Sequence, residues 1–401
     1  VGFGLDSAMF VGANRNKRGL ALDLTSADGQ EVLGKLLSTA DIVVDNMRPA
    51  AKEKLGIDFP SLQAINPRLI SINVSAFGTN GPYAGRPGID PLAQALGGLM
   101  SVTGEPGGRP LKAGSPIVDA TTAHLVVISA FAALRRRDKS GNGELIEVNL
   151  LDALFNLQPT VMSQYLVAGH EQPATGCGSD LMAPYGQFRC RDGRYWQITS
   201  LNQKFFANIC NALDCIQLLK DARFADNASR MENQAALESL LAEKVALYDS
   251  VELEQRFAHA DVLAAPVNTI AEAVSNEQLL HNGMLVEVEH ARLGRIKSAR
   301  LPVRFADDPA TREQQAAPKL GQHNAEVLSQ LGYSSEEITA LYKAGTVRIT
   351  RVLTLAHSLD HCWNLVKVEW MMPKMLMWWY MNTVMPFLIA PHQEQIPGMK
   401  D

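Results

Sequence analysis

In the first part of the chain, short apolar runs alternate with segments whose apolar residues recur at helical spacing. Two of the runs, at 41–45 and 69–75, are rich in Val and Ile, which is typical of strands buried inside a parallel sheet. The segments between them are long enough to carry the chain back to the start of the next strand as helices. The pattern predicts strands at about 19–24, 41–45 and 69–75 and helices at about 27–38 and 60–65. We therefore expect an α/β fold with a Rossmann-like parallel sheet.

The pattern changes after these strands and again near residue 183. Residues 76–118 are rich in Gly and Pro, and the segment APYGQFRCRDGRYWQITS from residue 183 predicts two strands joined by a turn. We expect a large domain over 1–182, a smaller α+β domain over 183–300 and a return segment over 301–349. Further helices are predicted at about 90–102, 120–136, 150–168, 203–213, 231–248, 251–259 and, after Ser334 or Ser335, in SSEEITALYKAG; further strands are predicted at 145–149, 285–290 and 294–305.

Residues 350–401 differ from the rest of the chain in composition. They contain four of the five Trp and seven of the 14 Met. Their most apolar stretch, MMPKMLMWWYMNTVMPFLIA, is interrupted by two prolines, Lys374 and Asn382. A membrane-spanning helix needs about 20 predominantly apolar residues, so a membrane partner is disfavoured. The alternative is an appended or aberrant tail that no catalytic function requires.

Charge and residue counts exclude several classes of protein. The net charge is −5 with no basic block, which argues against nucleic-acid binding. Five Cys without a CxxC pair do not form a disulfide scaffold and favour a reducing compartment, so we expect a cytoplasmic protein, or a mitochondrial one in a eukaryote although no transit segment is visible. No secretory pattern begins the chain. The nine His include no convincing metal pair, and no metal is expected.

Ligands of α/β proteins bind at the carboxyl ends of the parallel strands. The loops after Leu24, Val44 and Val74 qualify, and none of them is a dinucleotide-binding or P-loop motif. Asp119, in AGSPIVDATTAHLVV, follows a Gly- and Pro-bearing loop and precedes a helix. Such an aspartate is an ordinary helix cap. It is also placed to be a nucleophile, with helix N–H groups stabilising an oxyanion.

Four blocks of the sequence resemble the family III CoA-transferases, the CaiB–BaiF family. They are NRNKRGLALDL, ADIVVDNMRPAAKEKLGIDFPSLQAINPRLI, SAFGTNGPYAGRPGID and LMSVTGEPGGRPLKAGSPIVDATTA. Their order and spacing match the family, and the resemblance extends over residues 10–349. It implies an α/β large domain with a smaller domain, in protomers that form interlocked rings as a homodimer.

The resemblance also implies chemistry. It places the catalytic aspartate of the family on Asp119, which would form an aspartyl anhydride with the donor acyl group and then an aspartyl-CoA thioester. Coenzyme A would be a substrate, together with a carboxylic acid, and no permanently bound cofactor or metal would be needed. The CoA-contacting positions of the family fall on Leu22, Asp23, Leu24, Thr25, Asn46, Met47, Arg48, Ala51 and Lys54.

Three comparisons with the family refine this expectation. Related acyl-CoA racemases carry a His where this chain has Ile89, and a side chain without a titratable group cannot exchange a proton. A transferase is therefore favoured over the alternative, a racemase of 2-methylacyl-CoA. Segments such as NQKFFANICNALD resemble the branch that uses dicarboxylic acids such as succinate. The family's first strand–helix unit has no counterpart here, so an inactive truncated homologue is the other alternative.

Overall fold

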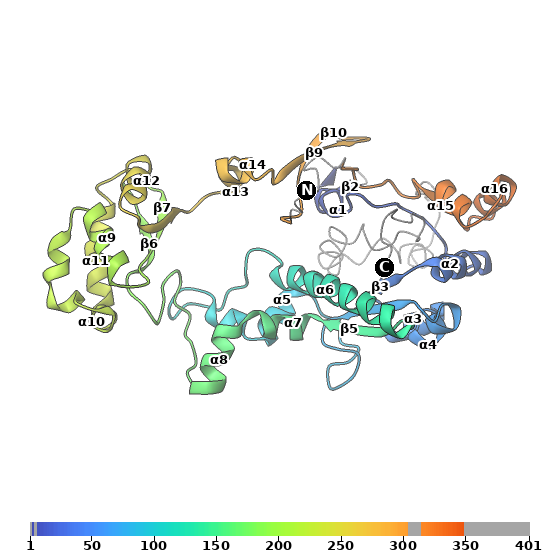
Figure 1. The fold of residues 1–401 in the computed structure, drawn as a ribbon, viewed down its shortest axis with the longest axis horizontal. Helices are drawn as coiled ribbons and strands as arrows, with labels where there is room; N and C mark the ends of the chain where they lie inside the picture. Colours follow the sequence, from blue (N-terminus) through green and yellow to red (C-terminus); the bar gives the residue numbers. More distant parts are fainter. Residues whose placement is uncertain (1, 4–5, 304–313, 349–401) are drawn as a thin grey trace, which may run out of the picture. The chain divides into compact units, whose positions relative to one another are not determined.

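The computed structural model describes residues 2–3, 6–303 and 314–348. The chain divides into two compact units. Of the described residues, the first comprises those up to 97, 114–158 and those from 281 to 348, and the second comprises 98–113 and 159–280 (Figure 1). The predicted domain boundaries at 182 and 300 stay a prediction. The predictions for residues 350–401 lie outside the described residues.

A parallel three-stranded sheet organises the first unit. Its order is β3 (Ile42–Asp45), β4 (Ile70–Ser75) and β5 (Leu145–Asn149), and both pairings are parallel. The central strand β4 is buried along nearly its whole length, which explains its uninterrupted apolar run. The predicted α/β fold with a parallel sheet is thus confirmed.

The predicted strand at 19–24 is wrong. This segment makes only an isolated antiparallel bridge between Leu22 and Val347. Its apolar side chains pack instead in a cluster with Val32 and with Leu328 and Ile338, which belong to the helices near the end of the described chain. The run is therefore apolar because it covers these helices, and no sheet hydrogen bonds follow from it.

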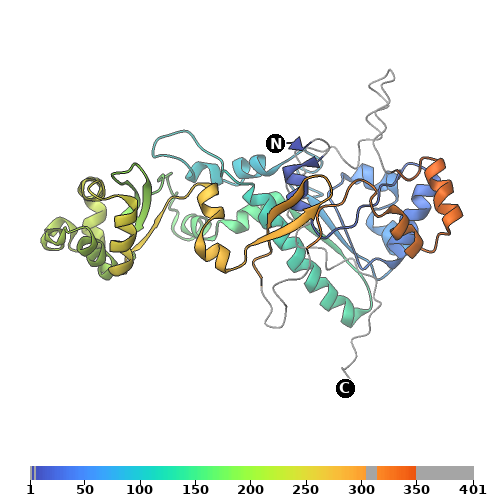
Figure 2. The same cartoon turned by 90° about the horizontal axis from the view of Figure 1, so that it is seen from above.

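Helices before and after β3 in sequence begin at side-chain caps. Ser26 accepts a hydrogen bond from the backbone of Gly29 at 3.0 Å and starts α2 (Ala27–Thr39), and Asp58 starts α4 (Phe59–Ile65) in the same way. The long α6 (Ile117–Ser140) lies beside the strands in both views and packs against β4 and β5 (Figures 1 and 2). By length and composition alone α6 would also suit a membrane span, and one face of it is buried in this unit.

The last turns of α6 are tied to the sheet. Arg137 lies in a basic run and is nevertheless buried. Its guanidinium forms an ion pair with Asp41 at 2.7 Å and donates to the carbonyl of Arg68 at 3.2 Å. Because these partners directly precede β3 and β4, Arg137 holds α6 against the start of both strands.

Two predicted helices are interrupted. The helix predicted at 90–102 ends as α5 (Asp90–Leu96), and a 3₁₀ turn at Leu99–Val102 follows Gly98, whose φ of 84° suits glycine. The helix predicted at 150–168 divides into α7 (Leu150–Leu157) and α8 (Pro159–Ala168). Pro159 explains the break, because proline favours the first turn of a helix and disrupts its interior.

The second unit is built on an antiparallel sheet of order β6 (Tyr185–Arg189), β7 (Tyr195–Thr199) and β8 (Leu263–Pro266). The predicted hairpin at the RDG turn is confirmed. Its core gathers Phe188, Trp196 and the buried faces of the helices around them. Those helices are α9 (Gln203–Ala212), α10 (Asn227–Glu232), α11 (Gln234–Val245) and α12 (Ser250–His259); α13 (Ile270–Val274) has no buried residue.

The remaining elements of the described chain are short. The strands predicted at 285–290 and 294–305 form as β9 (Leu285–His290) and β10 (Gly294–Ala299), which ends earlier than predicted, and the two pair antiparallel. Ser334 rather than Ser335 caps the last described helix, through a capping box with Glu337. The other elements are β1 (Gly2–Phe3), β2 (Asp6–Ser7), α1 (Ala8–Ala13), α3 (Pro49–Leu55), α14 (Glu277–His281), α15 (Asn324–Gln330) and α16 (Ser335–Lys343).

Candidate functional site

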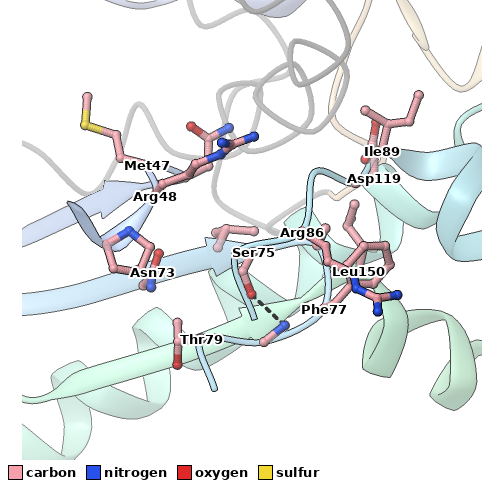
Figure 3. A pocket seen from close by; sticks show the side chains of 17 residues that line it. Met47, Arg48, Asn73, Ser75, Phe77, Thr79, Arg86, Ile89, Asp119 and Leu150 are labelled. Carbon is pink, nitrogen blue, oxygen red and sulfur yellow. Dashed lines mark hydrogen bonds between the residues drawn. The ribbon is translucent and has the colours of Figure 1, made fainter. Parts of the chain in front are cut away.

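A pocket lies in the first unit, at the carboxyl ends of its three parallel strands (Figure 3). It encloses about 660 Å³, including space open to solvent. This is the edge at which α/β sheets bind ligands. The loop after β3 contributes Asn46, Met47, Arg48 and Pro49; β4 and the loop after it contribute Asn73–Thr79, Gly85, Arg86, Gly88 and Ile89; Leu150 and Asp119 complete the lining.

Asp119 is the most unusual side chain of the pocket. It is in the first turn of α6 with 2% of its surface exposed, and its Oδ2 has no hydrogen-bond partner among the described residues. Burial, and secondarily the negative charge of Asp90, raise the pKa of Asp119 to about 7. A buried oxygen without a partner costs stability, and groups of this kind are concentrated at functional sites.

Asp90, at the start of α5, holds the first turn of α6 in place. Its Oδ2 accepts hydrogen bonds from the backbone N–H groups of Val118 at 2.8 Å and Asp119 at 3.1 Å. Its Oδ1 accepts from the Gln94 side chain, which is itself buried. The interpretation of Asp119 as a helix cap is therefore wrong. Asp90 does the capping from 29 residues away in sequence, which leaves the Asp119 carboxylate directed at the pocket.

The backbone N–H groups at the start of α6 are already occupied. Besides the two held by Asp90, Ile117 donates to the carbonyl of Ser115 at 2.9 Å and Ala120 to that of Pro116 at 3.1 Å. The hypothesis that this helix start supplies oxyanion donors is wrong for the described conformation. Asn73 also lines the pocket, and its Oδ1, a hydrogen-bond acceptor, has no partner among the described residues.

The predicted CoA-binding positions fall into two groups. Asn46, Met47 and Arg48 line the pocket together with Asp119. Figure 3 labels Met47, Arg48 and Asp119. Ala51 and Lys54 are exposed on α3 and do not line it. The structure thus brings one of the two predicted loops to the nucleophile candidate.

Leu22, Asp23, Leu24 and Thr25 also lie outside the lining of this pocket. Leu22 packs in the apolar cluster with the last described helices. Asp23 accepts hydrogen bonds from the Thr25 hydroxyl at 2.6 Å and backbone at 2.9 Å, and the hydroxyl bond above all lowers the pKa of Asp23. The assignment of this segment to CoA stays a prediction.

A buried ion pair fixes the loop after β3. Lys52 Nζ lies 2.8 Å from Asp45 Oδ2, and each side chain is 8% exposed. Asp45 Oδ1 accepts from the backbone N–H of Met47 at 3.1 Å. The pair therefore determines how Asn46, Met47 and Arg48 are presented to the pocket. The sequence analysis singled out Lys54 and missed Lys52. The usable signal was Asp45 at the end of a strand, with a lysine seven residues after it.

Sequence reasoning also missed Asn73 and Arg86. Asn73 interrupts a buried apolar strand, ISINVS, and an amide in that position is itself a signal of a polar site. Arg86 lies in a loop that was identified, but no residue of it was assigned a ligand-binding role. Within the described chain, Asp119 is the only acidic residue of the lining, and Arg48 and Arg86 are its only Lys or Arg.

The chain matches the family model "CoA-transferase family III" over residues 3–324. It belongs to CoA-transferase family III. The enzyme is 31% identical over 330 residues to succinate–glutarate CoA-transferase of Agrobacterium fabrum, with 82% of each chain covered. It is 30% identical over 333 residues to succinyl-CoA–D-citramalate CoA-transferase of Chloroflexus aurantiacus, with 83% of each covered. The predicted family and the predicted class of enzyme, a CoA-transferase, are thereby confirmed.

Solved structures agree with this assignment. A CaiB/BaiF family protein from Brucella suis superposes with a TM-score of 0.74 at 33% identity, covering 81% of this chain and 84% of that one. The substrates of the CoA-transferase are accordingly a CoA thioester and a carboxylic acid. No group of three or more His, Cys, Asp or Glu side chains in the described ranges could hold a metal ion.

Proposed function

We propose that this enzyme transfers CoA from an acyl-CoA donor to a dicarboxylic acid, with Asp119 as the covalent nucleophile. The observation that carries the proposal is the buried Asp119 carboxyl, which faces the strand-end pocket with one oxygen unbonded. The names of the relatives contain succinate, glutarate and citramalate, which are all dicarboxylates. These names support the acceptor class.

In the first half-reaction the Asp119 carboxylate attacks the thioester carbonyl of the donor. The C–S bond breaks, CoA leaves as a thiolate, and the acyl group and Asp119 form a mixed anhydride. The thiolate then attacks the carbonyl carbon of Asp119. The donor acid leaves as its carboxylate, and Asp119 becomes an aspartyl-CoA thioester.

The second half-reaction is the reverse with a new acid. The acceptor carboxylate attacks the aspartyl thioester, and CoA thiolate and a second anhydride form. The thiolate attacks the acceptor carbonyl, which releases the new acyl-CoA and the free Asp119 carboxylate. Only the ionised form of Asp119 can begin the cycle, so a pKa near 7 predicts a rate that rises with pH through that value.

The residues around Asp119 suit this chemistry. Arg48, and Lys54 further along α3, supply positive charge for the phosphates of CoA, while Met47 and Ile89 give the pocket apolar walls that limit the access of water to the anhydride. We extend CoA binding to Leu22, Asp23, Leu24, Thr25, Asn46 and Ala51 on the strength of the family resemblance. Ile89 in the lining also disfavours an epimerase, because it supplies no proton-transfer group.

Chemical trapping tests the nucleophile. The enzyme is incubated with succinyl-CoA and quenched with hydroxylamine, which converts an activated aspartyl group into a hydroxamate. We expect the modification on the peptide that carries Asp119, and a loss of transfer of at least about 10³-fold in Asp119→Ala. Asp152→Ala, a carboxylate outside the pocket lining, is the matched control. Full transfer by Asp119→Ala would refute the proposal.

We also propose that the enzyme is a homodimer. Large apolar side chains are exposed on α5 and α6, among them Leu92, Leu96, Ile128 and Phe131, and exposed apolar surface favours association. Light scattering on the eluting protein gives the mass directly. A mass of one protomer at micromolar concentration contradicts the dimer and leaves the assignment of Asp119 untouched.

A further inference from the structure

Arg86 is an exposed arginine whose guanidinium forms no hydrogen bond or ion pair with the described residues. It lies in the loop after β4 and lines the same pocket as Asp119. Its backbone N–H donates to the carbonyl of Tyr83 at 3.1 Å. Among the described residues its side chain contacts the Tyr83 ring and makes neither a hydrogen bond nor an ion pair. An arginine at a pocket wall that is unpaired in this way is available to an anionic ligand.

Aromatic stacking holds this guanidinium in place. Its central carbon lies 4.1 Å from the centroid of the Tyr83 ring, and Tyr83 in turn meets Phe77 edge-on at a centroid distance of 5.9 Å. Stacking uses the flat face of the guanidinium and leaves the N–H groups at its edge free. Those N–H groups form the planar fork that binds a carboxylate through two parallel hydrogen bonds.

The two arginines of the pocket lie in different places. Figure 3 shows Arg48 on the side formed by the loop after β3, and Arg86 on the other side, with Ile89, Asp119 and Leu150. Arg48 is in the loop that carries the predicted CoA contacts, whereas Arg86 is on the side of the reacting carboxyl group. Both residues line one pocket, so an acyl group bound to Asp119 shares that pocket with the Arg86 side chain.

The charge of Arg86 suits a substrate that carries a second carboxylate. Asp119 is the only acidic residue lining the pocket among the described residues, and it must be ionised to react. A second carboxylate on the acyl chain would be repelled by the ionised Asp119. That carboxylate would also lose hydration on entering the pocket. A stacked guanidinium nearby offsets both costs, and a neutral chain would gain nothing from it.

We propose that Arg86 binds the distal, non-reacting carboxylate of dicarboxylic substrates and thereby selects them over neutral acids of the same length. This inference rests on the proposed function and names the residue that sets its substrate class. Arg86 is in this account a specificity residue, which touches the substrate but takes no part in bond making.

The second half-reaction gives a clean test. In a ping-pong enzyme, kcat/KM for the acceptor depends only on the aspartyl-CoA enzyme and that acceptor, so the donor can be succinyl-CoA throughout. The acceptors are glutarate and its monoamide, which has nearly the same shape without the distal charge. The quantity measured is the ratio of kcat/KM for glutarate to kcat/KM for the monoamide.

In Arg86→Gln we expect this ratio to fall about 10- to 100-fold, the effect of one charge-assisted pair. The loss falls on glutarate. Arg86→Lys should keep part of the discrimination, because charge remains but the stacked fork is lost. Tyr83→Phe should keep the ratio and Tyr83→Ala should lower it, which tests the stacking separately. Arg48→Gln is the matched control: we expect a higher KM for succinyl-CoA and an unchanged ratio.

The outcomes separate the two proposals. An unchanged ratio in a folded, active Arg86→Gln enzyme overturns the role of Arg86 and leaves the transferase mechanism intact. If the ratio falls in Arg48→Gln and not in Arg86→Gln, the role of Arg86 is likewise overturned. If the wild-type enzyme transfers CoA to neither acid, the proposed function fails, and this inference fails with it.

Discussion

The carboxyl group of Asp119 should make the enzyme less stable as the pH rises, and Asp119→Asn should remove that effect. Asn has almost the same shape, and it does not titrate. Asp119 is 2% exposed, and burial together with the charge of Asp90 raises its pKa from an ordinary 3.8 to about 7. The folded enzyme therefore holds a proton on Asp119 over a range of pH in which the unfolded chain has lost it.

The sign and size follow from this difference. A carboxyl whose pKa is higher in the folded state stabilises the fold fully below about pH 4, and the contribution is lost as pH rises to about 7 and is absent above it. The interval spans about 3 pH units, and each unit corresponds to about 1.4 kcal/mol, so the full effect is about 4 kcal/mol. Of this, about 2 to 3 kcal/mol falls between pH 5 and pH 8.

Urea unfolding at several pH values measures the effect. The quantity is the free energy of unfolding of Asp119→Asn minus that of the wild type, and we expect it to increase by about 2 to 3 kcal/mol from pH 5 to pH 8. Asp221→Asn is the control, because Arg223 holds the pKa of Asp221 below its usual value and the carboxylate is ionised throughout this range. A difference that stays constant from pH 5 to pH 8 would refute the reasoning and place the Asp119 carboxyl in an ordinary environment.

Three other changes give separable results. Asp90→Asn removes the charge beside Asp119 and keeps an acceptor for the two backbone N–H groups, so the acidic limb of the kcat/KM profile should move to lower pH. Lys52→Met leaves Asp45 buried without its partner and should cost about 3 kcal/mol or more in urea unfolding, with much of the loss restored in Asp45→Asn/Lys52→Met. Gly88→Ala places a Cβ 2.3 Å from that of Ala76, so the loop after β4 must shift, and calorimetry should show weaker binding of CoA.

Local patterns allowed much of the sheet to be predicted. The strands β3 and β4 are short β-branched runs, which is typical of parallel strands, and β4 is buried along nearly its whole length. The caps at Ser26 and Ser334 depend on residues within three positions, so the local sequence is sufficient to find them. The strand expected at 19–24 was wrong because apolar runs look alike whether they join a sheet or cover a helix pair.

The site depends on contacts between segments far apart in the chain. Asp119 could be singled out from the sequence, but its role as a cap was an open alternative because Asp90, which does the capping, is 29 residues away. The same holds for Arg86. Only the folded structure shows that no described carboxylate lies against its guanidinium. Spacing along the chain says what a residue can bind, and only packing says whether that binding is already satisfied.

The most direct test of the central claim follows an oxygen atom. If Asp119 is the covalent nucleophile, an acceptor acid labelled with ¹⁸O in its carboxylate forms the anhydride, and attack of CoA thiolate on the acceptor carbonyl leaves one labelled oxygen on Asp119. Mass spectrometry of the digested enzyme after a single turnover should find that atom on the peptide that carries Asp119. Labelled acyl-CoA product with no ¹⁸O on Asp119 would contradict the account.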